Sequence, residues 1–166
     1  MKINVCVADE SHAVYAQQIC DLVYVSAQER GTGIAKRTPE YIAQKMKVGK
    51  AVIALTEEGE LAGFAYVETW SHTLFVANSG LIVAHKFRKT GLAKRIKQEV
   101  FNLSRRKYPD AKIFSITTGA AVMKINSDMG FRPVPFSELT DDAEFWAGCK
   151  GCKNFDILER NNYKMC

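Results

Sequence analysis

The sequence lacks any apolar run that approaches the length of about 20 residues needed to cross a bilayer, and its N-terminus has no long apolar segment of the signal-peptide type. It also lacks internal repeats, low-complexity tracts and a recognisable linker. At 47% hydrophobic and 25% charged residues, its composition excludes a disordered or collagen-like chain. We therefore expect a single cytoplasmic domain over residues 1–166, large enough for a hydrophobic core and with no membrane partner.

A disulfide framework is not expected, because no secretion signal is present and the five cysteines make an odd count. Cys6 and Cys20 lie in apolar runs and are predicted to be buried thiols. Cys149 and Cys152 have C-x-x-C spacing, but a zinc site would need two more ligands, and no histidine lies near Cys166, the obvious third. We expect simple thiols in a glycine turn and no metal; a redox pair and zinc are the weaker alternatives.

The formal net charge of +5 is unevenly distributed along the chain. Residues 86–107 hold nine basic residues and one acidic residue, a local charge of +8, whereas the rest of the chain is slightly acidic. Aromatic residues do not interleave this basic segment as they do in nucleic-acid-binding surfaces, apart from Phe87 and Phe101. The segment therefore favours a small anionic ligand, and no nucleic-acid partner is expected.

Hydrophobic periodicity predicts two helices, a three-stranded meander and then a mixed α/β half. The helices are expected at 11–30, with Val14 in the apolar stripe, and at 38–49, where Thr38 and Pro39 form a typical helix start. The remaining strands are expected at 3–7, 51–56, 61–70, 74–84, 113–117, 131–134 and 155–158, and the remaining helices at 92–107 and 120–129. Residues 136–153 are expected to form an irregular excursion before the last strand, with a short helix at 141–146. This order indicates an α+β (mixed α/β) fold.

The segment from Leu81 to Ala93 holds the clearest chemical signal. A strand ends, a basic loop with one glycine follows, and a helix begins, so free amide groups and the helix dipole point into the loop. Gly91 lets the backbone approach an anion closely, and the small Ala93 does not obstruct it. This arrangement predicts a phosphate-binding loop, although the spacing of a nucleotide P-loop and of G-x-G-x-x-G is absent.

The run Arg88-Lys89-Thr90-Gly91-Leu92-Ala93 resembles the R/Q-x-x-G-x-G/A motif of the GNAT N-acetyltransferases. The preceding Leu81-Ile82-Val83 resembles the family's central strand, with Phe87 at its usual aromatic position. About forty residues later, the run from Ile125 to Phe131 resembles the family's helix that ends in Gly-Phe. The resemblance covers most of residues 1–135, and it implies a mixed, mostly antiparallel sheet flanked by helices.

This resemblance implies an N-acyltransferase of the EC 2.3.1 type that uses acetyl-CoA or another acyl-CoA as co-substrate. The backbone of Arg88, Lys89, Thr90, Gly91, Leu92 and Ala93 would hold the pyrophosphate. Leu81, Ile82 and Val83 would pair with the pantetheine arm as if it were an added strand. An amide near Val83 would polarise the thioester carbonyl.

The catalytic acid and base are less clear. The family's usual tyrosine acid, four residues before the glycine of Gly-Phe, is Asn126 here. An asparagine can donate a hydrogen bond to a departing thiolate but cannot deliver a proton at neutral pH. Glu68, late on a central strand, is the favoured base, although a solvated strand-end carboxylate is its plainer interpretation.

In the family, the segment between the first two helices lines the acceptor pocket. Here it contains Arg30, Lys36 and Arg37, which would bind the carboxylates of a small acidic amine such as glutamate. A flexible solvated loop is the plainer interpretation. Two other functions stay open: an acetyltransferase for protein lysines or N-termini, and a non-catalytic acyl-CoA sensor, which the missing tyrosine favours. The sequence also leaves open whether the protein forms a homodimer.

Overall fold

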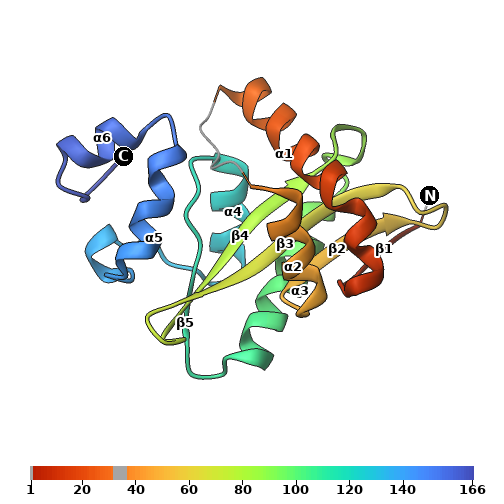
Figure 1. Ribbon diagram of the computed structural model, residues 1–166, viewed down its shortest axis with the longest axis horizontal. Helices are drawn as coiled ribbons and strands as arrows, with labels where there is room; N and C mark the ends of the chain where they lie inside the picture. Colours follow the sequence, from red (N-terminus) through yellow and green to blue (C-terminus); the bar gives the residue numbers. More distant parts are fainter. Residues whose placement is uncertain (1, 32–36) are drawn as a thin grey trace.

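The computed structural model describes residues 2–31 and 37–166. A five-stranded sheet forms its centre, with the strands in chain order from one edge to the other (Figure 1). The first three pairings are antiparallel and the last is parallel, which confirms the expected mixed, mostly antiparallel sheet. The strands are β1 (Ile3–Val7), β2 (Ala51–Thr56), β3 (Leu61–Trp70), β4 (Phe75–Val83) and β5 (Lys112–Phe114).

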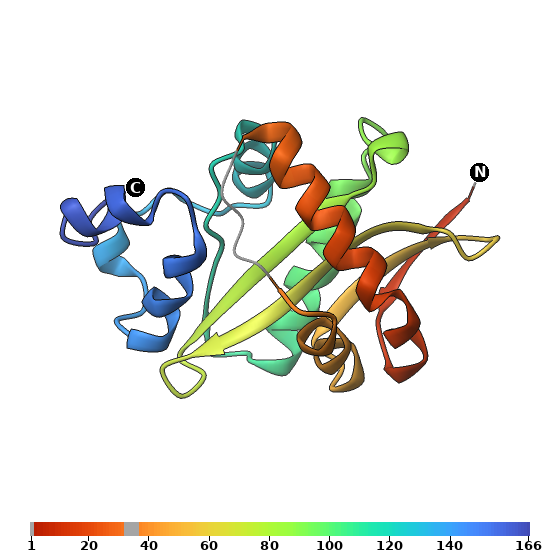
Figure 2. The same ribbon diagram turned by 45° about the horizontal axis from the view of Figure 1, so that its top comes forward.

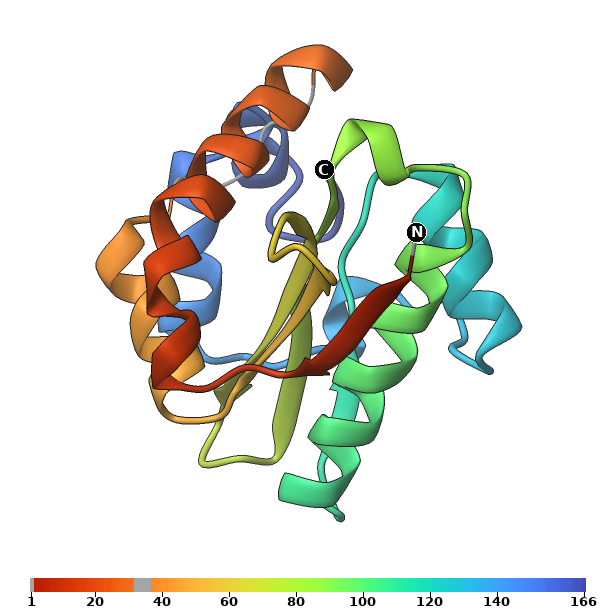
Figure 3. The same ribbon diagram turned by 90° about the vertical axis from the view of Figure 1, so that its right-hand side faces the viewer.

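Helices cover both faces of the sheet. On one face lie α1 (Ala16–Arg30), which crosses the strands in Figure 2, and α2 (Pro39–Lys47). On the other face lies α3 (Leu92–Lys107), so that Figure 3 shows the sheet between two helical layers. The helix α4 (Ala120–Asp128) follows β5. The two cores match these layers: Ile19, Met46 and Phe64 are buried beneath α1 and α2, and Val67 and Ile96 beneath α3.

Local sequence explains the helix ends. The Thr38 side chain accepts a hydrogen bond from the amide of Tyr41, and Pro39 occupies the first turn of α2.

The first predicted helix is divided into two parts in the structure: residues Glu10–Tyr15 form a 3₁₀ helix, and α1 begins at Ala16. The prediction for Val14 was wrong, since its side chain is 79% exposed. The 3₁₀ geometry takes it off the stripe that α1 presents to the sheet.

The prediction of two late strands was also wrong. Residues 131–135 form no strand, because Pro133 and Pro135 remove the amide donors that a sheet pairing requires. Residues Phe155–Arg160 form the helix α6, in which Phe155 and the buried Leu158 lie three residues apart on one face. The excursion at 136–153 therefore precedes a helix, and it contains α5 (Ala143–Ala147) and two 3₁₀ turns.

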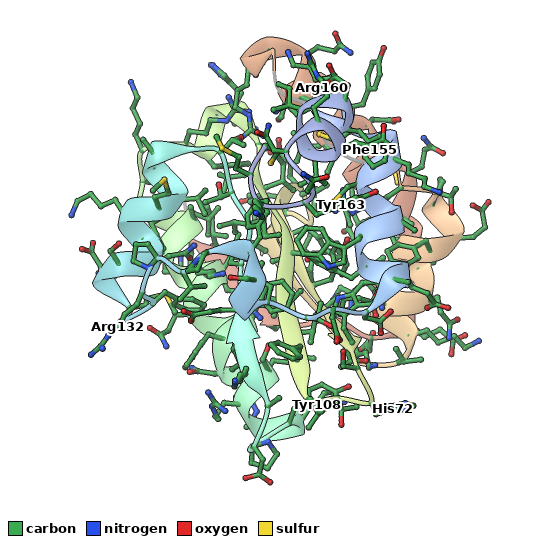
Figure 4. All side chains as sticks on the ribbon, turned by 90° about the vertical axis from the view of Figure 1, so that its left-hand side faces the viewer. His72, Tyr108, Arg132, Phe155, Arg160 and Tyr163 are labelled. Atoms are coloured by element: carbon green, nitrogen blue, oxygen red, sulfur yellow. The ribbon has the colours of Figure 1, made fainter. Side chains whose placement is uncertain are left out.

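Aromatic contacts attach this C-terminal part to the far end of the sheet. The Phe145 ring lies 5.4 Å from the rings of both Trp70 and Phe114. The Asp142 carboxylate accepts a hydrogen bond from the amide of Ser71, in the turn between β3 and β4. Figure 4 shows this side of the molecule, where Tyr163 lies 5.9 Å from the Trp146 ring. Among the described residues, no helix is both long and apolar enough to span a membrane.

A β-bulge interrupts β4 near its middle. Phe64 pairs with Ile82 and Tyr66 with Ser79, so β4 contains one extra residue opposite Ala65. Gly80 lies in the bulge with a φ of +66°, and a Cβ atom there would lie 2.5 Å from the Tyr66 ring. Only glycine meets both conditions without strain.

The geometry of this bulge predicts a large stability difference between two glycine substitutions. Gly80→Ala should lower the free energy of unfolding by about 2–4 kcal/mol, from left-handed backbone strain and the clash with Tyr66. Gly148→Ala is the matched control, because Gly148 has helical φ and ψ of −61° and −22° and no atom within 4 Å of an added Cβ. Urea unfolding should place this control within about 0.5 kcal/mol of the wild type; equal effects would contradict the assignment of the bulge.

Candidate functional site

The start of α3 presents free amide groups. Gly91 caps the helix with a φ of +81°, and its carbonyl accepts hydrogen bonds from the amides of Lys94 and Arg95 at 3.1 and 3.3 Å. The amides of Leu92 and Ala93 precede these first intrahelical bonds and point out of the helix end. A Cβ atom on Gly91 would meet nothing within 4 Å, so the backbone borders open space. This end of α3 has the geometry of an anion-binding site.

The basic loop before α3 uses its predicted binding residues in different ways. Arg88 turns back toward α1: its guanidinium donates to the carbonyl of Val83 at 3.2 Å, to the Ser26 hydroxyl at 2.9 Å and to Glu29 at 3.2 Å. The Thr90 hydroxyl donates to the carbonyl of Phe87 at 2.7 Å. Lys89 is exposed, with a φ of +64°. Arg88 and Thr90 therefore shape the loop, while Lys89 adds charge at its surface.

Beyond the bulge, the outer edge of β4 opens. In the described part of the chain, β5 pairs with β4 only from Phe75 to Ala77. The amide of Ala84 donates to Ala62 on β3, so by alternation the Val83 amide points to the opposite, open edge, where the Val83 carbonyl accepts from Arg88. The side chains of Leu81 and Val83 pack under α3, and Ile82 packs on the α1 side. This edge leads from the bulge to the loop at the start of α3.

Two buried amide oxygens lack partners beside this opening. Asn78 and Asn126 are 6% and 7% exposed, and the Oδ1 atom of each has no hydrogen-bond partner within the described residues. The Asn78 amide nitrogen is satisfied, since it donates to the Ser104 hydroxyl at 2.7 Å. Buried acceptors of this kind call for an external donor.

On the α1/α2 face, five side chains form what we call the acceptor cluster: Arg37, Tyr41, Lys45, Tyr66 and Glu68. Arg37, Tyr41 and Lys45 come from α2 and the loop before it, and Tyr66 and Glu68 come from β3. The Lys45 ammonium lies 2.5 Å from Glu68 Oε2, and the Tyr41 hydroxyl donates to the same oxygen. Arg37 Nε donates to the Tyr66 hydroxyl at 2.5 Å, with its guanidinium 5.3 Å from the Tyr66 ring centre. Since the Tyr66 ring packs on Gly80, the cluster adjoins the bulge.

The acceptor cluster keeps Glu68 ionised. Burial alone would raise the pKa of Glu68, but hydrogen bonds from Lys45 and Tyr41 and the charge of Lys45 outweigh it and lower the pKa below its usual range. Burial also disfavours the Lys45 ammonium and lowers the pKa of Lys45, despite the attraction of Glu68. At neutral pH the pair is a partly buried carboxylate–ammonium contact, and the predicted base is not a solvated strand-end residue.

The predicted acceptor-binding cations do not come together as a group. Arg37 belongs to the acceptor cluster, whereas Arg30 Nε donates to the Ser26 carbonyl within α1 at 3.1 Å, and Lys36 lies outside the described residues. Sequence reasoning missed Tyr41, Lys45 and Tyr66. A signal for them exists: Tyr41 and Lys45 are four residues apart on a helix, and Tyr66 and Glu68 are two apart on a strand, so each pair shares a face.

The cysteines show mostly structural environments. Cys6 and Cys20 are partly buried rather than fully buried, a correction to the prediction, because they lie at the margin of the second core. Burial raises the pKa of Cys149, and the nearby Cys152 and Cys166 raise it further. In the described part of the chain, no three His, Cys, Asp or Glu residues are grouped as a metal site would require.

Solved structures with this architecture are numerous. No protein-family model and no curated protein matches the chain. N-acetylglutamate synthase from Neisseria gonorrhoeae, complexed with coenzyme A and N-acetyl-glutamate, superposes on 99% of the chain at 17% identity and a TM-score of 0.67. The chain spans 33% of that enzyme's length.

Two shorter structures agree with this match. A GNAT-family acetyltransferase from Staphylococcus aureus matches 86% of the chain and 92% of its own length, at 14% identity and a TM-score of 0.67. Diaminobutyrate acetyltransferase from Paenibacillus lautus, with its substrate and coenzyme A, matches 78% and 74%, at 14% identity and a TM-score of 0.59. The chain therefore has the fold of the GNAT acetyltransferases, as its motifs indicate.

The lowered pKa of Glu68 predicts a specific pH dependence of stability. Because the folded-state pKa is depressed, its stabilising contribution is complete above about pH 4.3, the unfolded value, and is lost as the pH falls toward the folded value. Glu68→Gln should therefore lower the free energy of unfolding at pH 7 by about 1–3 kcal/mol, because it leaves Lys45 unpaired. It should also weaken the dependence of this free energy on pH in the acidic range. Urea titrations from pH 3 to 7 measure both. Glu57→Gln, at an exposed acid 4.0 Å from Lys2, should leave the profile unchanged; an equal change there would contradict the assignment.

Proposed function

We propose that the protein is an N-acyltransferase that transfers an acetyl or other acyl group from acyl-CoA to the primary amine of a small amino acid. The observation that carries this proposal is the open edge of β4, which runs from the bulge to the free amides at the start of α3. A pantetheine arm adds to that edge as a strand, and the pyrophosphate meets the amides of Leu92 and Ala93. The unpartnered oxygens of Asn78 and Asn126 support the same ligand.

The acceptor cluster supports an amine that also bears a carboxylate. Arg37 provides a planar guanidinium at the bulge, suited to a carboxylate, and Glu68 provides an ionised carboxylate on the same face, suited to an ammonium. An acidic amino acid such as glutamate fits this charge pattern. Two of the similar structures are acetyltransferases determined with N-acetyl-glutamate or diaminobutyrate, which favours an amino acid over a protein acceptor.

The reaction follows from this placement. The acceptor ammonium loses a proton to Glu68 or to water, and the free amine attacks the thioester carbonyl carbon. The free-edge amide of Val83 donates to the carbonyl oxygen as negative charge develops there. The C–N bond forms, the C–S bond breaks, and CoA leaves with the electron pair. Release of CoA thiol in the presence of amines distinguishes this enzyme from an acyl-CoA sensor, which the asparagine at position 126 would permit.

A glutamate side chain at position 91 tests the cofactor site. Gly91→Glu places a carboxylate where the pyrophosphate is expected, and acetyl-CoA affinity measured by calorimetry should fall at least about 100-fold through charge repulsion and blocked approach. Gly49→Glu is the matched control, since Gly49 has a similar φ of +65° and lies after α2, where an added Cβ would meet only Lys107. The control should bind normally; unchanged binding by Gly91→Glu would refute the site.

The proposed role of Arg37 predicts a selective kinetic defect. With L-glutamate as acceptor, Arg37→Gln should raise KM for the amino acid about tenfold or more and leave KM for acetyl-CoA unchanged, because one charge-assisted contact is lost. Arg160→Gln, at an exposed arginine paired with Asp156 on α6, should have wild-type constants. A rise in both KM values for Arg37→Gln would indicate general disruption and contradict a carboxylate-binding role.

A further inference from the structure

Lys97 is a buried cation without a counter-ion. Its side chain is 1% exposed, and within the described residues it has neither a carboxylate in ion-pair range nor a hydrogen-bond acceptor. Its close partner is the Phe131 ring, whose centre lies 4.9 Å from the ammonium nitrogen. A buried charge in such surroundings is costly to the fold, and nothing in the core packing requires one.

The position of Lys97 along α3 is set by its neighbours. The adjacent Ile96 reaches the sheet at Gly63, which pairs with Val83 on β4. A Cβ atom added to Gly63 would lie 2.5 Å from Ile96 Cδ1 and 2.8 Å from the Ile82 carbonyl oxygen, so Ile96 lies beside Ile82 and Val83. Two turns further on, Ser104 contacts Asn78. Lys97 therefore lies level with the part of β4 beyond the bulge, where the strand edge is open.

The Lys97 side chain crosses toward α4 rather than over the sheet. Phe131, on which it stacks, follows the end of α4, and the Phe131 amide donates to the Asn126 carbonyl at 3.0 Å. The ammonium thus lies near Asn126, whose side-chain oxygen is buried and unpartnered. Lys97 and Asn126 are thus linked through Phe131, and α3, which carries Lys97, packs on the β4 strand whose edge is open.

The charged groups on the surrounding elements have other partners or other directions. On α4, Lys124 pairs with Asp128, and on α3, Arg106 pairs with Glu99.

The other nearby cations bind backbone carbonyls or aromatic rings. Arg105 donates to the carbonyls of Pro109 and Ala111, and Arg95 donates to the carbonyl of Ile3. On β5, Lys112 lies over the Phe75 ring, and Cys6 on β1 is a partly buried thiol. Arg132, beside Phe131, points outward in Figure 4. No described carboxylate neutralises Lys97.

We propose that Lys97 is the proton donor to the CoA sulfur in the acyl transfer described above, on which this inference rests. As the C–S bond breaks, the thiolate takes a proton from the Lys97 ammonium, giving CoA thiol and a neutral amine. Solvent then returns a proton to Lys97, matching the proton that the acceptor nitrogen released. Asn126 cannot supply this proton, so the role falls to the buried ammonium near it.

The acidity of Lys97 fits this role. Burial lowers the pKa of Lys97 to about 8, near the value of about 8.5 for a cysteine thiol, so an alkyl thiolate can take its proton without a large uphill step. An ordinary exposed lysine would hold its proton too tightly. The positive charge also stabilises the thiolate before the proton moves.

Binding measurements test the contact without turnover. Wild-type protein at pH 8 should bind CoA about tenfold more tightly than desulfo-CoA, which lacks the sulfur, as expected for one charge-assisted contact. Lys97→Met should lose that preference while binding desulfo-CoA as the wild type does. Lys107→Met, at an exposed lysine in the last turn of α3, should keep it. CoA, but not desulfo-CoA, should add the ultraviolet absorbance of a thiolate to wild type and not to Lys97→Met.

Kinetics separate charge from proton transfer. Lys97→Arg keeps a charge but cannot release a proton, so it should retain the preference for CoA while kcat falls at least about tenfold. Lys97→Met should lose both, and it should also lose the fall in kcat that we expect of the wild type above about pH 8. Its thermal stability should equal or exceed that of the wild type, which excludes unfolding as the cause.

The outcomes distinguish the two proposals. Equal preference for CoA over desulfo-CoA in wild type and Lys97→Met, or an unchanged kcat in Lys97→Arg, would overturn the role of Lys97 alone. Failure of wild-type protein to bind either CoA or desulfo-CoA would overturn the proposed acyltransferase function, and the role of Lys97 with it.

Discussion

The organisation of the site depends on how the backbone of β4 is hydrogen-bonded. On one edge β4 pairs with β3 along most of its length, whereas on the other it pairs with β5 for only three residues. The bulge at Gly80 re-aims the strand where that second pairing has ended. Beyond it, peptide groups face an opening rather than a neighbouring strand. The extended ligand that we propose would satisfy them, and its position relative to both helical layers would then be determined.

The basic segment at residues 86–107 has several separate uses in the structure. Arg88 ties its loop to α1, Arg105 bonds the loop that follows α3, Arg106 pairs with Glu99 along α3, and Lys97 is buried. Lys86, Lys89, Lys94 and Arg95 are exposed near the start of α3, whereas the three exposed cations at its far end are separated from them along the helix. This distribution suits a single compact anion such as a pyrophosphate. A polymer backbone would require a continuous exposed strip of charge.

Sequence reasoning worked where local chemistry decides the structure. Caps and periodicity placed the helix at Pro39–Lys47 and the strand at Leu61–Trp70, and the order of elements indicated the sheet. It failed at Phe155–Arg160, because six residues fit either period and no paired strand was available. It named Glu68 as a base but could not find Lys45 beside it, since that contact joins α2 to β3 across the fold. The spacing of residues can place side chains on one face of an element, but it does not say which faces of two distant elements meet.

Lys97 shows why a residue can matter most where it fits the pattern least. It lies one position after Ile96 in the helix that packs on the sheet, a place where an apolar side chain would stabilise the fold. The amide oxygens of Asn78 and Asn126 are a similar cost on the same side of the sheet. Within the described residues, the two amide oxygens have no donor, and Lys97 has only the Phe131 ring in place of a counter-ion. Buried polar groups that the folded chain leaves without an opposite charge or donor are best explained by a ligand that completes them, because stability alone would favour their replacement.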